Sequence, residues 1–418
     1  MLATPNALAD VLTQSAIRAV YQPIVELDSG RAIGFEALAR GPVGSVFESP
    51  MNLLDAAHSE GRLAEVDWMC RAAAIRGALD IGLRRPHALF VNVEPAAISA
   101  PAPETLRTLL DRAADELRIV VEITERALRA DPAAILDAVA RIRARGWEIA
   151  LDDVGVAAES LALLPLIQPD VVKLDMSMLH NYGDAILGSV ADAVATERDR
   201  RDLVILAEGI ENPEHLDEAR VLGASLGQGW HFARPSDRPI APDGMAVMSA
   251  SHVAAPENRS PLEIIGAHHQ LRVAEKRLLM PMSRQLESRI DRDPDPAVLF
   301  GTFQVANYFS PATARRYSSY SRRSPFVAAF ATGLPADPAP GVRGADIAPD
   351  DGLARYWIVA VLGPHYAGAL VAHDLMDHGV ADGNRRFEFA ISHRRDVVAP
   401  IVQHLMRRVQ PFDDESPV

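Results

Sequence analysis

The fold is constrained most by a regular alternation of short apolar runs and amphipathic segments over the first 235 residues. From the third run onward the residues are nearly continuous in Val, Ile, Leu and Ala, which is typical of strands covered on both faces. The eight runs are AVYQPIVEL (19–27), RAIGFEAL (31–38), HALFVNVEP (87–95), RIVVEITE (118–125), WEIALDDVG (147–155), DVVKLDMS (170–177), LVILAEGI (203–210) and ASLGQGWHF (224–232). Eight strands alternating with helices predict an α/β fold, a (β/α)₈ TIM-type barrel.

One connection departs from the usual barrel pattern. The first two runs are separated only by Asp28-Ser29-Gly30, which is too short for a crossover helix. These two strands should therefore pair antiparallel as a hairpin. The prediction is a barrel with an antiparallel first strand.

A second, smaller domain follows a stretch rich in Pro, Ser and Ala. We expect a helical pattern over 261–290 that is interrupted at Pro281, then five strand-like runs, and a closing helix over 395–409. This pattern predicts a second α/β (α+β) domain. The expected boundaries are 1–240 for the barrel, 241–260 for a linker and 261–418 for the second domain.

Composition limits the classes of function. The 418 residues include 42 Lys+Arg against 56 Asp+Glu, a net charge of -14, which argues against non-specific binding to nucleic-acid polymers or anionic lipid. The single cysteine, Cys70, excludes an intrachain disulfide. No apolar run approaches the roughly 18 residues of a membrane span, and the N-terminus lacks the features of an export signal. We expect a soluble, cytoplasmic protein without membrane insertion.

Polar residues fall at the ends of the expected strands, and most of them are acidic. Because the C-terminal strand ends of such a barrel converge on one face, these side chains should meet there. They are Glu36, Asn92, Glu122, Glu125, Asp152, Asp153, Lys173, Glu208 and Gln228. Gathered carboxylates repel one another unless cations lie among them, and hard oxygen ligands without a His or Cys cluster suit Mg²⁺ or Mn²⁺.

Each residue taken alone also has a structural explanation. Asn92 can hydrogen-bond a turn, and Asp152-Asp153 can form a turn before Gly155. Lys173 is one of only two lysines among 42 basic residues. It either pairs structurally with a carboxylate or supplies a compact amine that arginine cannot replace.

The motifs FEALAR, FVNV, EITE, LDD, KLD, AEGIE and GQGWHFARP occur in order over residues 18–236. Together they resemble the EAL family of cyclic di-GMP phosphodiesterases. The resemblance implies a hydrolase that opens cyclic di-GMP to linear pGpG with two divalent cations, Mg²⁺ or Mn²⁺. It also implies a homodimer.

The same resemblance implies a role for each matching residue. Glu36, Asn92, Glu122, Asp152 and Asp153 match ligands of the two-cation centre, with Asp152 bridging, and Glu208 matches a further carboxylate there. Lys173 matches the residue that holds and helps deprotonate the attacking water. Glu125 matches a brace for the loop after Asp153, and Gln228 a residue holding water or substrate. Gln22, Leu38 and Arg40 match the substrate groove, with Arg40 suited to a phosphate.

The loop after the aspartate pair departs from the family pattern. In place of a sequence like DFGTG the chain has Val154, Val156 and Ala157 at the Phe, Thr and second Gly positions. The ligand residues remain, so a working but slow or regulated enzyme is expected. The alternatives are a receptor that binds cyclic di-GMP without cutting it, and a protein-interaction platform that binds no nucleotide.

The C-terminal region is similar to the DICT sensory domain, through RQLESRI, the segment FGTFQVANYFSPATARRYSSYSRRSPFVAAFATG, and the runs RYWIVAVLG and YAGALVAHDL. This similarity implies a sensory or regulatory role for the second domain. Arg315, Arg316, Arg322 and Arg323, with Tyr317 and Tyr320 among them, could form an anion or nucleic-acid patch. Because the charge of this domain is balanced, a solvated helix face is expected instead.

Overall fold

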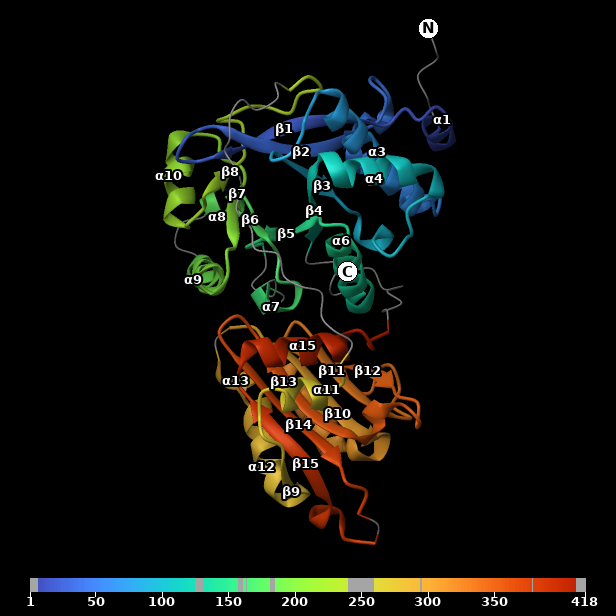
Figure 1. The fold of residues 1–418 in the computed structure, drawn as a ribbon, viewed down its shortest axis with the longest axis vertical. Helices are drawn as coiled ribbons and strands as arrows, with labels where there is room; N and C mark the ends of the chain where they lie inside the picture. Colours follow the sequence, from blue (N-terminus) through green and yellow to red (C-terminus); the bar gives the residue numbers. More distant parts are fainter. Residues whose placement is uncertain are drawn as a thin grey trace. The chain divides into compact units, whose positions relative to one another are not determined.

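The computed structural model describes residues 7–124, 131–156, 161–162, 164–180, 185–239, 259–293, 295–377 and 379–410. The chain forms two compact units (Figure 1). The first consists of Met1–Ala127, Asp137–Val156 and Pro169–Val253, and the second of Leu128–Leu136, Ala157–Gln168 and Ala254–Val418. Most of the expected linker lies outside the described residues, so the boundaries drawn from the sequence stay predictions.

The first unit is a closed barrel in which eight strands follow one another in sequence order, as predicted. β1 runs antiparallel to both of its neighbours, β2 and β8, and all other neighbouring pairs are parallel. The strands are β1 (Arg18–Glu26), β2 (Ala32–Arg40), β3 (Ala88–Asn92), β4 (Arg118–Thr124), β5 (Glu148–Val154), β6 (Val171–Leu174), β7 (Val204–Ala207) and β8 (Leu226–Gly227).

The β1–β2 hairpin turns at Gly30, whose φ is +67°, a backbone conformation that glycine adopts without strain. Its register places Gln22 opposite Glu36. The short Asp28-Ser29-Gly30 connection therefore has the consequence expected from the sequence. It also brings two polar side chains of the predicted site across from each other.

Helices connect most of the barrel strands. α3 contacts β1, β2 and β3, and α4 contacts β4. The helices before residue 230 are α1 (Leu8–Thr13), α2 (Pro50–Ser59), α3 (Leu63–Asp80), α4 (Arg107–Glu116), α6 (Pro132–Ala144), α7 (Leu164–Ile167), α8 (Ser177–His180), α9 (Ala185–Arg200) and α10 (Pro213–Val221), with short 3-10 turns at Val46–Glu48, Pro95–Ala97 and Glu104–Leu106.

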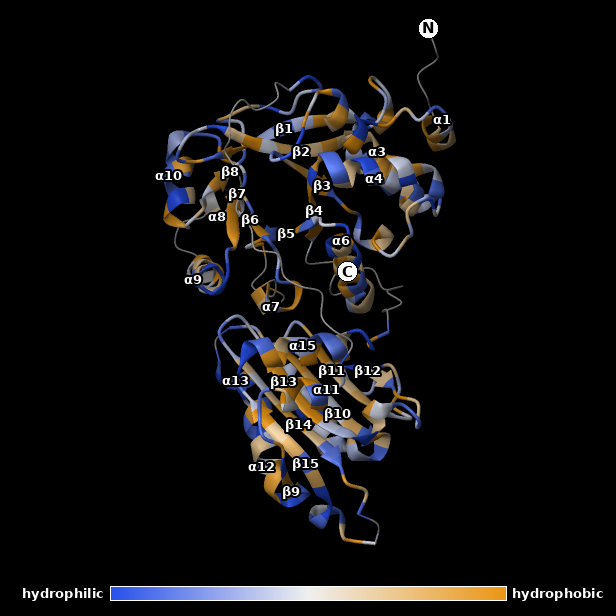
Figure 2. Ribbon diagram, viewed as in Figure 1, coloured by the Kyte–Doolittle hydropathy of each residue, from blue (hydrophilic) through white to orange (hydrophobic). Residues whose placement is uncertain are grey.

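The eight strands share one apolar cluster, to which each contributes at least one buried side chain. Figure 2 shows β7, for example, as hydrophobic over much of its length. The members are Ile24, Ile33, Ala88, Phe90, Val120, Ala150, Val171, Val204, Leu206 and Leu226. This cluster forms the base on which the polar residues described below are placed.

The second unit contains a seven-stranded sheet with the order β12-β11-β10-β13-β14-β15-β9. The pairs β10–β11 and β11–β12 are parallel, and the other pairs are antiparallel, so the sheet is mixed. Its strands are β9 (Arg272–Glu275), β10 (Val298–Val305), β11 (Val327–Thr332), β12 (Arg343–Asp346), β13 (Tyr356–Leu362), β14 (Ala367–Asp374) and β15 (Arg386–Ser392).

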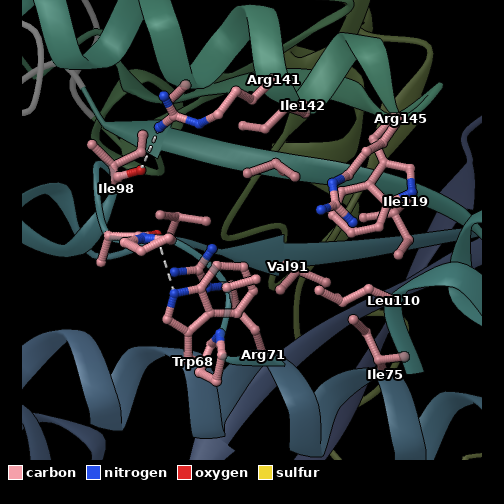
Figure 3. A pocket seen from close by; sticks show the side chains of 18 of the residues that line it. Trp68, Arg71, Ile75, Val91, Ile98, Leu110, Ile119, Arg141, Ile142 and Arg145 are labelled. Carbon is pink, nitrogen blue, oxygen red and sulfur yellow. Dashed lines mark hydrogen bonds between the residues drawn. The ribbon is translucent and has the colours of Figure 1, made fainter. Parts of the chain in front are cut away.

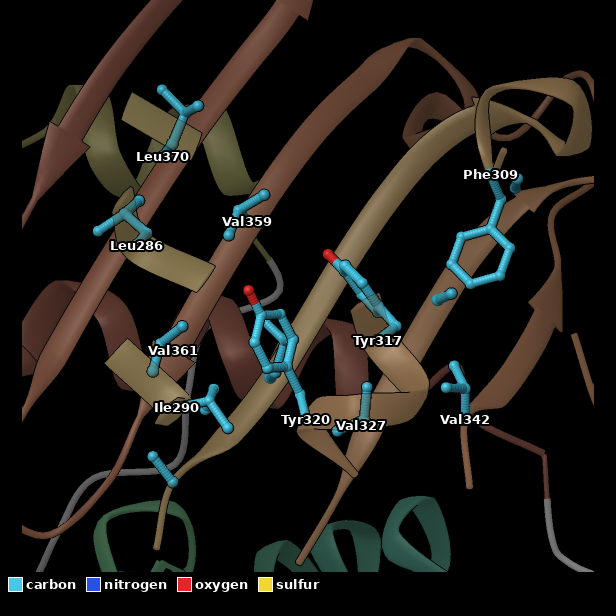
Figure 4. Close-up of a cluster of buried hydrophobic side chains, with 14 of the residues drawn as sticks. Leu286, Ile290, Phe309, Tyr317, Tyr320, Val327, Val342, Val359, Val361 and Leu370 are labelled. Carbon is cyan, nitrogen blue, oxygen red and sulfur yellow. The ribbon is translucent and has the colours of Figure 1, made fainter. Parts of the chain in front are cut away.

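A large core cluster lies between this sheet and three helices. In Figure 4, Leu286 and Ile290 lie by the strand residues Val359 and Val361, and Tyr317 and Tyr320 come from the neighbouring helix. The helices of the unit are α11 (Pro261–Gly266), α12 (Lys276–Glu287), α13 (Arg289–Arg292), α14 (Pro311–Tyr320) and α15 (Arg395–Met406), with 3-10 turns at Ala306–Tyr308, Gly352–Arg355 and Asp382–Asn384. The mixed sheet with its helices confirms a second α/β domain.

The expected helical pattern over 261–290 was wrong in two respects. The segment contains a strand, β9, between α11 and α12, because Arg272–Glu275 pairs antiparallel with β15 at the edge of the sheet. Pro281 lies inside α12 and does not end it. The packing of Leu279 and Leu286 in the core outweighs the hydrogen bond that proline removes.

Among the described residues, no helix combines the length and the apolar composition needed to cross a bilayer.

Candidate active site

The polar site residues lie two positions beyond core residues on the same strands. Because alternate side chains of a strand share a face, each polar side chain projects on the same side as the apolar one before it. The pairs are Phe90 with Asn92, Val120 with Glu122, Ala150 with Asp152, Val171 with Lys173, Leu206 with Glu208, and Leu226 with Gln228. A polar layer therefore lies on the apolar one at the C-terminal strand ends.

Lys173 lies at the centre of this layer and is 1% exposed. Its Nζ is 2.7 Å from Glu122 Oε1 and 2.7 Å from Glu208 Oε1. The same nitrogen is 3.1 Å from Asp152 Oδ1 and 3.9 Å from Glu36 Oε1. One ammonium thus contacts four carboxylates that come from four different parts of the barrel.

Glu36 is held from its other side by side-chain amides. Asn92 Nδ2 donates to Glu36 Oε1 at 3.0 Å, and Gln228 Nε2 donates to Glu36 Oε2 at 2.6 Å. Gln228 Nε2 also lies 3.1 Å from Gln22 Oε1. Gln22 in turn donates to the main-chain carbonyl of Ala233 at 3.1 Å. The first and last strands of the barrel are therefore joined at this site.

Three carboxylates lie close enough together to bind one cation. One oxygen of each lies within 4.8 Å of the other two, and the residues are Asp152, Asp153 and Glu208. Asp153 adopts a φ of 59°, in the left-handed region that aspartate tolerates better than most side chains. This conformation follows the end of β5 and lets two consecutive aspartates contribute to one group. The structure therefore brings Glu36, Asn92, Glu122, Asp152, Asp153, Lys173, Glu208, Gln22 and Gln228 together.

Burial and mutual repulsion change the proton affinities of these groups. Burial, with repulsion from Glu36, raises the pKa of Glu122 well above its ordinary value. Burial also raises the pKa of Glu208 to about 7, although the nearby Lys173 opposes the shift. For Lys173, burial favours the neutral amine, but the surrounding carboxylates raise its pKa well above the ordinary value. Lys173 is thus a protonated donor in this arrangement.

The donor set fits hard divalent cations. Both oxygens of Glu122 and Oδ1 of Asp152 are buried and lack a well-directed hydrogen bond to any described residue, despite their short charge contacts with Lys173. Buried oxygens of this kind require a partner. Among the described residues, five carboxylates gather here with the one ammonium of Lys173, an excess of acidic groups that bound divalent cations would offset. Oxygen ligands without His or Cys suit Mg²⁺, Mn²⁺ or Ca²⁺.

Of the remaining predicted residues, Leu38 and Arg40 make no hydrogen bond or ion pair with this group among the described residues, and Glu125 lies outside the described residues. Leu38 and Arg40 follow Glu36 along β2 and are half-buried. The Arg40 guanidinium donates to its own neighbour, the Ala39 carbonyl, at 2.7 Å. Burial and the nearby Arg18 lower the Arg40 pKa. The loop residues from Ala157 to Glu159 also lie outside the described residues.

Two features near Gln22 and Gln228 were not expected from the sequence. The Ala233 carbonyl orients Gln22, and no side-chain signal can point to a main-chain acceptor. Trp230 is 55% exposed, and the Arg234 guanidinium lies 4.1 Å from the centre of its ring. An exposed aromatic two residues after a site glutamine was visible in GQGWHFARP. Such a ring offers a stacking surface for a nucleobase.

A cavity of about 360 Å³ on the outside of the barrel is separate from this site. It lies between α3, α4, α6 and the barrel wall, where Val91 and Ile119 point away from the barrel interior (Figure 3). Trp68 and Arg71 border it, with the guanidinium 3.6 Å from the centre of the indole ring. None of the carboxylates around Lys173 lines it.

The sequence model of the EAL domain matches residues 5–235, more than half of the chain. The chain belongs to the EAL-domain family. Residues 263–375 match the "Sensory domain in DIguanylate Cyclases and Two-component system", the DICT domain. The EAL barrel and the DICT sensory domain expected from the motifs are thus both confirmed.

Two relatives named as phosphodiesterases are similar to this chain over about half of its length. The probable cyclic di-GMP phosphodiesterase PdeB of Escherichia coli is 30% identical over 234 residues, which is 55% of this chain and 44% of that protein. A cyclic di-GMP phosphodiesterase of Pseudomonas aeruginosa is 28% identical, over 53% of this chain and 39% of that protein. The chain thus spans less than half the length of these two relatives.

Solved structures also match this part. Klebsiella pneumoniae BlrP1, in a complex with manganese and cyclic di-GMP, is 29% identical with a TM-score of 0.47 and covers 53% of this chain and 56% of that one. A cyclic di-GMP complex of the PaMucR phosphodiesterase is 26% identical with a TM-score of 0.47, over 55% of this chain and 95% of that one.

Proposed function

We propose that the EAL barrel is a divalent-metal-dependent phosphodiesterase that hydrolyses cyclic di-GMP to linear pGpG. The observation that carries this proposal is the gathering of carboxylates at the C-terminal strand ends, where four of them contact the single ammonium of Lys173 and Asp153 lies beside Asp152 and Glu208. Membership of the EAL family and the activities named for its relatives supply the substrate.

Six residues would hold two Mg²⁺ or Mn²⁺ ions: Glu36, Asn92, Glu122, Asp152, Asp153 and Glu208. When bound, such a pair of ions lowers the pKa of a water molecule and stabilises negative charge on the phosphoryl group. Hydrolysis then forms one bond from the water oxygen to phosphorus and breaks the bond from phosphorus to the 3′ oxygen, which takes up a proton. One cleavage opens the ring.

Lys173 would orient the attacking water. The carboxylates around it keep the amine protonated, so at first it can only donate a hydrogen bond. With the same carboxylates engaged as metal ligands, Lys173 would hold its proton less strongly. It would then be able to exchange a proton with the water. The Gln22–Gln228–Glu36 network would fix the carboxylate beside it.

The remaining assignments concern substrate and the nearby loop. We assign Leu38 and Arg40 to the substrate groove, with Arg40 directed to a phosphate. Glu125 is assigned as the brace of the loop after Asp153. The DICT domain would modulate the turnover of the barrel in response to its own signal.

The test is to incubate the full chain with cyclic di-GMP and either Mg²⁺ or Mn²⁺ and to follow pGpG by chromatography. Product should form with at least one ion and stop when a chelator is added. Glu36→Ala should abolish turnover because it removes a ligand, whereas Glu60→Ala, an exposed position at the end of α2, should leave it intact.

If no pGpG formed with either Mg²⁺ or Mn²⁺ at high protein concentration, the proposal that the barrel is an enzyme would be wrong. The competing function, a receptor that binds without cutting, is favoured by the altered loop, in which Val154 is buried and Val156 is 62% exposed. A receptor would retain cyclic di-GMP in the presence of a chelator with no loss of ligand over hours.

A further inference from the structure

The DICT domain contains a cavity of about 620 Å³ between α12, the start of α14 and the sheet. All of its lining residues belong to the second unit. Small-molecule sites in proteins are typically about 300–1,000 Å³. The cavity is therefore large enough for a ligand, and the inference drawn from it is independent of the activity of the barrel.

Aromatic side chains form one wall. Trp357 on β13 and Phe387 on β15 are buried and meet edge to face, with ring centres 5.8 Å apart. Phe303 on β10 also lines the cavity and continues into the core through edge contacts with Phe309 and Tyr317. Rings fixed in a core provide a rigid, flat surface that favours a planar ligand.

The charges at the cavity are predominantly positive. Four cations line it, and two of them are matched by its two carboxylates: Lys276 Nζ is 2.6 Å from Asp382, and Arg316 Nε is 2.7 Å from Glu287. Arg277 pairs with Glu275 outside the cavity. Arg284 has no carboxylate within 4 Å among the described residues. Its guanidinium is thus available to an anion.

Two side chains of the cavity wall carry hydrogen-bond donors. Ser283, which is 3% exposed, and Trp357, which is 8% exposed, both line the cavity. The Ser283 hydroxyl and the Trp357 indole N–H are donors that a ligand in the cavity can use. Both donors favour a ligand with oxygen acceptors.

One edge of the cavity is held by a polar network. The Tyr308 hydroxyl accepts from Arg385 at 2.7 Å, and Lys276 Nζ lies 4.3 Å from the Tyr308 ring centre. Gln304 accepts from Arg385 at 3.1 Å and donates to Asp374 at 3.0 Å. The Gln304 backbone has a φ of 62°, a strained conformation for a non-glycine residue of the kind often found at binding sites.

We propose that this cavity binds a small aromatic carboxylate. The ring would pack against Trp357 and Phe303, and the carboxylate would accept hydrogen bonds from the Arg284 guanidinium and the Ser283 hydroxyl. The ion pairs Lys276–Asp382 and Arg316–Glu287 would form part of the cavity wall without binding the carboxylate. A neutral or cationic compound of the same shape would gain the aromatic contact and lose the charged one.

Titration calorimetry on the full chain tests this with three probes of one ring size: 2-naphthoate, 2-naphthylmethanol and 2-naphthylmethylamine. The naphthoate should bind at least about tenfold more tightly than the alcohol, and the amine more weakly still. Arg284→Gln should weaken naphthoate binding about tenfold and leave the alcohol unaffected. Arg322→Gln, an exposed arginine away from the cavity, is the matched control.

Ser283→Ala is a second, small change at the same place and should also weaken the carboxylate selectively. The proposal is overturned if naphthoate gives no binding signal, if the three probes bind equally, or if Arg284→Gln and Arg322→Gln have the same effect. Circular dichroism of each variant establishes that it is folded, so that a loss of binding is assigned to the side chain.

Discussion

The positive charge of Lys173 reduces the repulsion among the four carboxylates that surround it. The chain contains only one other lysine, Lys276. The presence of Lys173 inside an apolar strand was therefore a signal that the sequence already contained. Both interpretations left open by the sequence are compatible with the geometry. The amine pairs with carboxylates here, and in the proposed mechanism it would also orient the attacking water.

Replacing Lys173 by methionine should destabilise the metal-free protein by about 3–5 kcal/mol, because a buried charge cluster loses its counter-ion. The loss should be larger at pH 8 than at pH 5. Carboxyls with raised pKa values, such as Glu208 at about 7, bind protons in the folded state before they do so in the unfolded chain. Acid therefore relieves the repulsion. Urea unfolding in the presence of a chelator measures both effects.

Lys276→Met is the matched control for that experiment. Its partner Asp382 is half exposed, and such surface pairs contribute about 0–1 kcal/mol. Mg²⁺ or Mn²⁺ should also stabilise Lys173→Met more than the unmodified protein. If metal-free Lys173→Met and the metal-free unmodified protein had the same free energy of unfolding at pH 8, the central position given to Lys173 would be contradicted.

Trp230 lies within the motif GQGWHFARP but received no role from the sequence. We expect it to contact the substrate. Trp230→Ala should raise the KM for cyclic di-GMP about tenfold and leave kcat nearly unchanged, since base stacking on an aromatic ring contributes about 1–3 kcal/mol. Arg234→Gln, which removes the cation from the ring while leaving the indole, should change KM less. A fall in kcat at constant KM would exclude a stacking role.

Among the elements, the barrel strands were predictable because their apolar runs are long and each ends at a polar residue. β9 and β12 were not predictable, because Arg272–Glu275 and Arg343–Asp346 are short and polar and become strands only by pairing at the two edges of the sheet. Pro281 suggested a helix end, but core contacts made by α12 outweigh that local preference. Edge pairing and core packing are tertiary effects that a local pattern does not contain.

α15 contains a half-buried histidine that should make the second unit sensitive to acid. Burial, with repulsion from Arg408 and Arg407, lowers the pKa of His404 from 6.5 to about 4, although the nearby Asp351 opposes the shift. The Arg408 guanidinium donates to its ring nitrogen. Between about pH 6.5 and 4 the unfolded chain binds a proton that the folded domain does not, so stability falls as the pH decreases through this window.

His404→Gln should remove that part of the acid sensitivity. The measurement is urea unfolding of the full chain at pH 7 and pH 5. The difference between the two pH values should be smaller in His404→Gln than in the unmodified protein. His268→Gln, at an exposed position of the same unit, is the control. An unchanged pH dependence in the His404 variant would show that another group is responsible.

At the scale of the whole chain, the sequence predicted the family, the two kinds of domain and the side chains that meet around Lys173. It succeeded because alternation along each strand and convergence of strand ends are general rules, so six residues could be placed without knowing their distances. The cavity of the DICT domain was not predictable. Its walls combine α12, α14 and three strands whose distant residues carry no common motif.

The hydrogen bond between Gln22 and Gln228 joins positions 206 residues apart. A polypeptide emerging from the ribosome therefore cannot assemble this centre until about the first 230 residues have been made, because the eighth strand supplies the final amide. Any shortened product that stops before β8 should be catalytically silent however well its earlier strands fold. The proposed cleavage of cyclic di-GMP would accordingly begin only after barrel closure.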